Sequence, residues 1–167
     1  IVTLVSASSL PDPAGVTVVK ASTVEEMRDA IVLKSSDADL LIMAAAISDF
    51  TPANVSDRKI KKQGSGEMTL VLEKVEDFMP LAHGRNLVKV AFAAETNDLE
   101  MNARAKVAPK GAAFVVANDV SEPGSGFGTD TNRVTFVDAE GIAEQQPLMD
   151  KLDVGHAILD RALSLLS

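Results

Sequence analysis

Three long apolar runs, separated by stretches with helical periodicity, constrain the fold of this chain more than any other feature. The runs are "DLLIMAAA" (39–46), "LVKVAFAAE" (87–95) and "AAFVVAND" (112–119). Strands that are apolar on both faces are typical of a parallel sheet covered by helices on each side. Shorter strand-like runs occupy 1–6, 16–20 and 133–138, and helical patterns occupy 24–34, 98–106 and 148–166. This alternation predicts a three-layer α/β/α fold with a mostly parallel sheet.

The ends of the predicted helices carry their own signals. Capping boxes are expected at Ser22 with Glu25 and at Asn97 with Glu100. Pro109 and Gly111 are expected to end the second helix. The last helix has leucines on one side, at 148, 152, 159, 163 and 166.

The composition is that of one folded domain, residues 1–167. Of the residues, 46% are hydrophobic and 24% are charged, which is enough for a single core. The formal net charge of -8 argues against a general nucleic-acid or membrane-surface role, because both need broad basic faces. The absence of cysteine excludes disulfides, thiol catalysis and cysteine metal sites, and it fits a reducing cytoplasm.

Each central run ends in small residues followed by polar ones, and ligands bind at the carboxyl ends of parallel strands. The polar residues are Ser48 and Asp49, then Glu95, Thr96 and Asn97, then Asn118 and Asp119. One such end is explained by turn or helix capping. Three together favour a binding site at this edge.

The segment "DRKIKKQGSGE" (57–67) concentrates positive charge in an acidic chain. It predicts a two-stranded β-arm over about 58–73, with Lys59 and Lys61 on one face and Ile60 and Lys62 on the other. Two interpretations stay open. The lysines either protect an edge strand from aggregation or clamp several phosphates.

Other motifs carry weaker signals. Lys106 and Lys110 lie one turn apart, and complementing the helix dipole explains either one alone. The segment "GSGFG" (124–128) does not run from a strand into a helix, so it predicts a mobile loop and not a dinucleotide site. His83 and His156 lack metal-ligand spacing, and no metal ligands are identified.

An ordered set of motifs runs through the chain: "AAAISDFTP", "KIKK", "AFAAETND", "ARAKVAPK", "ANDVS", a Gly-Phe loop and "NRVTFVD". In this order they resemble the phosphopantothenate–cysteine ligase (phosphopantothenoylcysteine synthetase) family. In bacteria this is usually the C-terminal domain of a bifunctional coenzyme A biosynthesis flavoprotein. The resemblance covers nearly the whole chain and implies a Rossmann-like fold, a homodimer and a cytoplasmic enzyme.

The resemblance also implies the chemistry. CTP would activate the carboxylate of 4'-phosphopantothenate as an acyl-cytidylate, releasing pyrophosphate, and Mg²⁺ would accompany the nucleotide. The amine of cysteine would then attack, giving phosphopantothenoylcysteine and CMP.

Residue by residue, the resemblance implies that Lys59 is the catalytic, phosphate-binding lysine. Asn118 matches a substrate-binding position. The positions that match nucleotide contacts are Ala45, Ala46, Asp49, Lys59, Glu76, Asp77, Phe78, Met79, Phe92, Lys106 and Lys110.

Two family segments have no match here: a Gly-Gly-Thr strand end, and a Ser-Asn-Arg-Ser-Ser-Gly-Lys-Met-Gly segment that contributes substrate contacts. They are expected upstream of Ile1, together with the first strand and helix of the fold, so residues 1–167 alone are expected to be inactive. The flavin decarboxylase domain of the family is expected to be fused or associated in the parent protein. No FMN is therefore expected in this chain.

Two alternatives remain open from the residues. One is an NAD(P)-dependent Rossmann-like oxidoreductase, which binding of NADPH and not CTP would reveal. The other is a non-catalytic dimerisation module, in which Lys59→Gln would change assembly but not nucleotide binding. The preference for CTP over ATP rests on the resemblance alone.

Overall fold

The computed structural model of the chain describes residues 1–61 and 67–166, and its centre is a five-stranded sheet. The strands, in spatial order, are β10 (Ala143–Gln145), β9 (Thr135–Asp138), β7 (Phe114–Asp119), β6 (Val88–Glu95) and β3 (Leu40–Met43). The predicted apolar runs form the parallel strands β3, β6 and β7. Strand β9 pairs antiparallel with β7, and β10 pairs antiparallel with β9. The α/β class is confirmed, and the sheet is mixed.

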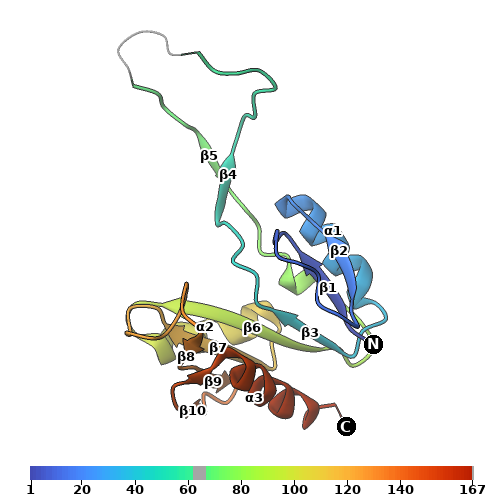
Figure 1. Cartoon of the computed structure of the whole chain (residues 1–167), viewed down its shortest axis with the longest axis vertical. Helices are drawn as coiled ribbons and strands as arrows, with labels where there is room; N and C mark the ends of the chain where they lie inside the picture. Colours follow the sequence, from blue (N-terminus) through green and yellow to red (C-terminus); the bar gives the residue numbers. More distant parts are fainter. Residues whose placement is uncertain (62–66, 167) are drawn as a thin grey trace. The chain divides into compact units, whose positions relative to one another are not determined.

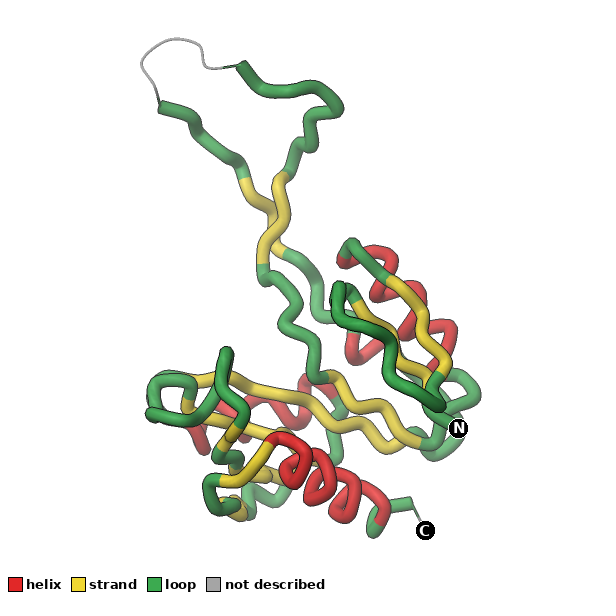
Figure 2. The backbone as a smooth tube through the Cα atoms, in the orientation of Figure 1, coloured by secondary structure: helices red, strands yellow, loops and turns green. Residues whose placement is uncertain are grey.

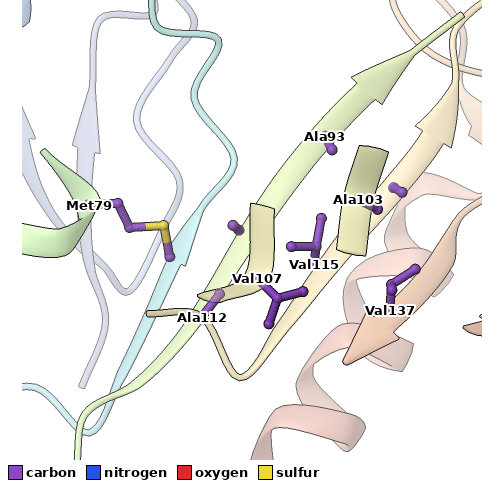
Figure 3. Packing of buried hydrophobic residues seen from close by; sticks show 9 residues of the cluster. Met79, Ala93, Ala103, Val107, Ala112, Val115 and Val137 are labelled. Atoms are coloured by element: carbon purple, nitrogen blue, oxygen red, sulfur yellow. The ribbon is translucent and has the colours of Figure 1, made fainter. Parts of the chain in front are cut away.

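Helices α2 (Leu99–Lys110) and α3 (Lys151–Leu163) cover opposite faces of this sheet, which confirms the three layers (Figure 1). Successive strand residues alternate between the faces. Val115 and Val137 therefore pack on the α2 side with Val107, as Figure 3 shows. Their strand neighbours Phe114 and Phe136 pack on the α3 side.

The side of α3 that is buried is not the side that carries the leucines. Val154, Ile158 and Ala162 are buried, whereas Leu152 is 72% exposed and Leu163 is 59% exposed. The leucines share a side of the helix, but that side faces away from the sheet.

The first part of the chain forms a separate parallel pair, β1 (Thr3–Ser6) and β2 (Thr17–Lys20), followed by α1 (Val24–Ser35), which contacts β1. The capping box of α1 uses Thr23 and Glu26, one residue later than predicted. The remaining short elements are η1 (Met79–Leu81), β8 (Thr131–Asn132) and β11 (Met149–Asp150), and β8 pairs with β11. Within the described residues, none of the helices has the length and hydrophobicity needed to span a bilayer.

The chain divides into two compact units, residues Ile1–Ala45 with Phe78–Ser167, and residues Ala46–Asp77. The second unit is a two-stranded arm, as predicted: β4 (Phe50–Pro52) pairs antiparallel with β5 (Leu72–Lys74) (Figure 2). The first strand lies earlier than predicted, whereas β5 overlaps the end of the predicted arm at Leu72 and Glu73. Residues 58–61 lie outside any described strand, so the expected alternation of Lys59 and Lys61 does not occur, and Lys62 to Gly66 lie outside the described residues.

Candidate functional site

The carboxyl ends of the three parallel strands meet at one edge of the sheet, where the sequence places polar residues. Glu95 ends β6 and Asp119 ends β7, and the two are register partners. Adjacent strands lie about 4.8 Å apart, so the two residues are neighbours on the sheet. Ala45 follows β3 at the same edge and is exposed. The structure therefore brings together residues that lie far apart in the sequence.

Lys106 reaches this edge from α2. Its Nζ lies 2.5 Å from Oε1 of Glu95, and Asn102 Nδ2 donates to Glu95 Oε2 at 3.1 Å. Helical side chains point toward the helix N-terminus, which explains why a residue in the third turn reaches the end of β6. Glu95 is only 13% exposed, so the pair is partly shielded from water.

Lys110 is the last residue of α2, one turn beyond Lys106. The helix continues through Pro109 and ends at Gly111, whose φ of 59° is left-handed. Only glycine adopts this conformation at little cost, so Gly111 and not Pro109 ends the helix. At the other end Asp98 is the N-cap, with no side-chain cap bond, so the predicted box at Asn97 and Glu100 is wrong.

Phe92 and Asn118 lie on the other face of the sheet from Lys106. Phe92 packs against the core on the α3 side, and Asn118 is 7% exposed at the end of β7. The two share a face because Phe92 pairs with Val116, and Asn118 lies two residues further along that strand. A ligand that touched Lys106 and Phe92 would have to pass around the end of β6.

Phe78 and Met79 are core positions. They are 4% and 1% exposed, and Met79 packs with Val107 of α2. Lys89 Nζ donates to the carbonyl oxygens of Met79, at 3.3 Å, and Ala82, at 3.1 Å. With their side chains buried, these two residues can offer a ligand mainly backbone groups.

The remaining predicted residues belong to the arm: Ala46, Asp49, Lys59, Glu76 and Asp77. Asp49 O accepts from Val75 N at 2.9 Å, which places Asp49 beside Glu76 at the base of the arm. Asp49, Lys59 and Glu76 are exposed. Of the predicted residues in the arm, Asp49 and Glu76 therefore lie at the paired base and Lys59 lies beyond it.

The glycine-rich loop after β7 leads into β8 and not into a helix, as predicted. Its conformation is fixed by Asn132, whose Oδ1 accepts from Ser125 Oγ at 2.6 Å and from Gly126 N at 3.0 Å. Ser125 and Asn132 are buried. These contacts argue against the expected mobility.

A cleft of about 520 Å³ at the same edge was not predicted. Its lining is Asp98, Leu99, Glu100, Met101, Asp119, Glu122, Arg133, Thr135 and Gln145. Of these residues, the sequence pointed to Asp119 alone as part of a binding site, because it is a polar residue at a strand end. The described residues include no group of three or more His, Asp or Glu side chains that could hold a metal ion.

The carboxyl of Asp119, at this edge, has a lowered pKa. Hydrogen bonds from the hydroxyl and then the backbone N–H of Ser121 hold the pKa of its carboxyl below the usual value. Both bonds stabilise the charged form. Asp119 therefore stays ionised at neutral pH.

Comparisons with known proteins agree on one family. The model of the DNA/pantothenate metabolism flavoprotein C-terminal domain matches residues 1–166. The coenzyme A biosynthesis bifunctional protein CoaBC of Bacillus subtilis is 40% identical over 160 residues, which are 94% of this chain and 39% of that protein. The chain thus spans about two fifths of the length of this curated relative.

Two solved structures share the fold. The crystal structure of the C-terminal domain of a CoaBC protein matches with a TM-score of 0.76 and 27% identity, over 98% of this chain and 74% of that one. A Cab2 mutant in complex with phosphopantothenate-cysteine matches with a TM-score of 0.72, over 90% of this chain and 54% of that one. At 18% identity, the second likeness shows the fold alone.

Proposed function

The chain belongs to the family of DNA/pantothenate metabolism flavoprotein C-terminal domains, and from this membership we propose that it is the ligase domain of coenzyme A biosynthesis. Its reaction would be the CTP-dependent joining of 4'-phosphopantothenate to cysteine. The observation that carries the proposal is the 40% identity to a bifunctional coenzyme A biosynthesis protein over 94% of the chain. Cab2, which shares the fold, has been solved in complex with phosphopantothenate-cysteine, a compound of the two groups that the proposed reaction joins.

In the first step a carboxylate oxygen of phosphopantothenate attacks the α-phosphorus of CTP, and the bond to the β-phosphate breaks to release pyrophosphate. In the second step the cysteine nitrogen attacks the acyl carbon. It loses a proton, and CMP leaves with the electron pair of the acyl–oxygen bond. Both steps develop negative charge on phosphate oxygens, and positioned cations stabilise such charge.

Lys59, Lys106 and Lys110 would supply the positive charge. For Lys106, the structure suggests how this happens, because its ammonium already contacts the Glu95 carboxylate. A nucleotide phosphate would replace this carboxylate as the partner, so the lysine would remain paired with an anion throughout. Glu95 thus holds Lys106 at the carboxyl edge of the sheet before the nucleotide arrives.

Magnesium would arrive as part of the nucleotide substrate. In nucleotide enzymes Mg²⁺ is commonly held by substrate phosphates and by only one or two carboxylates. This agrees with the absence, among residues 1–61 and 67–166, of a side-chain cluster that could cage a metal.

The test is calorimetric binding of CTP, ATP and NADPH, each with Mg²⁺, to the full-length natural protein and two variants. Lys59→Gln removes the proposed phosphate contact, and Lys61→Gln makes the same change in charge two residues away. We expect CTP to bind, and Lys59→Gln to weaken binding far more than Lys61→Gln. Because the contacts are between charges, affinity should also fall as ionic strength rises.

Turnover gives a second measurement. Loss of one electrostatic contact in the transition state typically lowers kcat by about 10²–10³-fold, so Lys59→Gln should slow CMP release by about that factor. Binding of NADPH without CTP would refute the ligase and favour an oxidoreductase. Unchanged CTP binding with altered assembly in Lys59→Gln would instead favour the dimerisation module. The homodimer and the association with a flavin decarboxylase domain remain part of this proposal.

A further inference from the structure

The cleft at the carboxyl edge is built by residues that the proposed ligase reaction does not use. One wall is the first turn of α2, from Asp98 to Met101, and the other is formed by the ends of β7, β9 and β10. Thr135 shares a sheet face with Val137, whose side chain packs on the α2 side. The cleft therefore lies on the α2 face. Its volume of about 520 Å³ is within the usual range for small-molecule sites.

The lining of the cleft is acidic. Four of its residues are carboxylates, Asp98, Glu100, Asp119 and Glu122, and one is a cation. That cation, Arg133, is already paired: its Nε lies 2.8 Å from Oε1 of Glu122. The remaining three carboxylates have no cation within the lining, so the cleft favours a positively charged ligand.

Thr135 adds an independent indication of a ligand. It is 5% exposed, and in the described part of the chain its hydroxyl has no hydrogen-bond partner. Its ladder neighbours are Ala117, which has no polar side-chain atom, and Gln145. No side-chain polar atom of the described residues is both sealed from solvent and unpaired, so this hydroxyl opens into the cleft that it lines. A polar group without a partner at such a position costs free energy until a ligand or water supplies one.

An organic cation fits this arrangement better than a metal ion. The described residues contain no group of three or more acidic or histidine side chains arranged to hold a metal. The lining also includes two apolar side chains, Leu99 and Met101, which a bare cation would not use. An aliphatic ammonium compound would use both the carboxylates and these apolar groups.

We propose that this cleft binds a small aliphatic amine in its protonated form. The carboxylates of Asp98 and Asp119 bind the ammonium group, and Leu99 and Met101 contact the carbon chain. The Thr135 hydroxyl pairs with a second polar group of the ligand. The site is independent of the ligase proposal, because none of these residues is assigned to nucleotide or phosphopantothenate.

Three probes of equal chain length test the charge requirement: putrescine, 1,4-butanediol and succinate, which end in ammonium, hydroxyl and carboxylate groups. Each is titrated into the ¹⁵N-labelled full-length protein while the amide resonances of Thr135, Gln145 and the first turn of α2 are followed. We expect saturable shifts with putrescine only. L-Cysteine is then added as a competitor. Displacement assigns the cleft to an amino acid, and lack of displacement assigns it to a diamine.

Variants locate the site. Asp119→Asn and Thr135→Val should each weaken putrescine binding, the former by about tenfold or more, as expected for loss of a bond to a charged group. Asp160→Asn makes the same change at an exposed carboxylate of α3, on the other face of the sheet, and should leave binding unchanged. The spectrum of each variant shows whether it is folded. Equal shifts with butanediol, no saturable shift at the cleft, or equal weakening by Asp160→Asn would overturn the proposal.

Discussion

Arg161 of α3 contacts two carboxylates and two aromatic rings, and replacing it with methionine tests how much these contacts stabilise the fold. Its guanidinium lies 5.3 Å from the ring centroid of Phe114 and 5.7 Å from that of Phe136. The same group pairs with Asp138 at 3.2 Å and with Glu144 at 2.7 Å. Arg161→Met keeps an unbranched side chain as far as the position of Nε and removes the guanidinium group with its charge.

The size of the effect follows from burial. Asp138 is 16% exposed, so its bond to the guanidinium should contribute about 1.5–2 kcal/mol. Glu144 is 56% exposed, and that pair should contribute about 0.5 kcal/mol. Two cation–π contacts with phenylalanine add about 1 kcal/mol. The free energy of unfolding should therefore fall by about 3 kcal/mol, which lowers the Tm by about 6–12 °C for a chain of this size.

Urea denaturation of the wild type and of Arg161→Met measures this loss. Glu144→Gln is the control and should cost no more than about 1 kcal/mol. A double-mutant cycle of Arg161→Met with Asp138→Asn should show a coupling energy above about 1 kcal/mol. If Arg161→Met lost less than about 1 kcal/mol, or if the two changes were additive, the reasoning from burial would be refuted.

Two further predictions concern the loop after β7. Ser121→Ala removes the hydroxyl bond, which contributes most to lowering the pKa of Asp119, so that pKa should rise toward its usual value. A carboxyl whose pKa is lower in the folded than in the unfolded protein stabilises the fold at pH values above the unfolded pKa. This stabilisation is lost as the pH falls through the folded pKa. The stability of the variant should therefore depend less on acid pH, and an NMR titration of Asp119 together with acid unfolding would measure this. Gly126→Ala puts a Cβ 3.1 Å from the backbone of Val120 at a φ of +87° and should cost more than about 2 kcal/mol in chemical denaturation. Gly128→Ala is the matched control, with a φ of +72° and no atom within 4 Å, and should cost only about 1 kcal/mol; equal losses would contradict the steric argument.

The sequence predicted the centre of the fold well, because its signals there are continuous. Each of the three apolar runs became a parallel strand, and 133–138 supplied β9. The ends of the helices were harder to place. Thr23 with Glu26 makes the same kind of box as Ser22 with Glu25, and only the backbone geometry selects between them. A proline close to the end of a helix, such as Pro109, likewise does not show whether the helix stops there or at the next glycine.

The buried side of α3 does not follow from the leucine pattern of its sequence. The side of α3 that carries the leucines is the more hydrophobic of its two sides. The side chains that are buried against the sheet are nevertheless Val154, Ile158 and Ala162. Val154 and Ala162 are smaller than leucine, and with Ile158 they pack against strands that already present Phe114 and Phe136. A sequence pattern shows which side of a helix is hydrophobic. It does not show how much space the side chains of the sheet leave for the helix residues that pack against them.

The proposed nucleotide site and the acidic cleft lie next to each other at the ends of β6 and β7. Glu95 and Asp119 are register partners, and Val120 N donates to Glu95 O at 3.0 Å, so the ends of β6 and β7 are joined. Glu95 holds Lys106, which the ligase proposal assigns to the nucleotide, and Asp119 lines the acidic cleft. A phosphate that drew Lys106 away would leave the Glu95 carboxylate without its cation, on the strand next to Asp119. That added negative charge would strengthen the attraction of the cleft for an ammonium group, and the two sites would then favour each other's ligands through electrostatics alone.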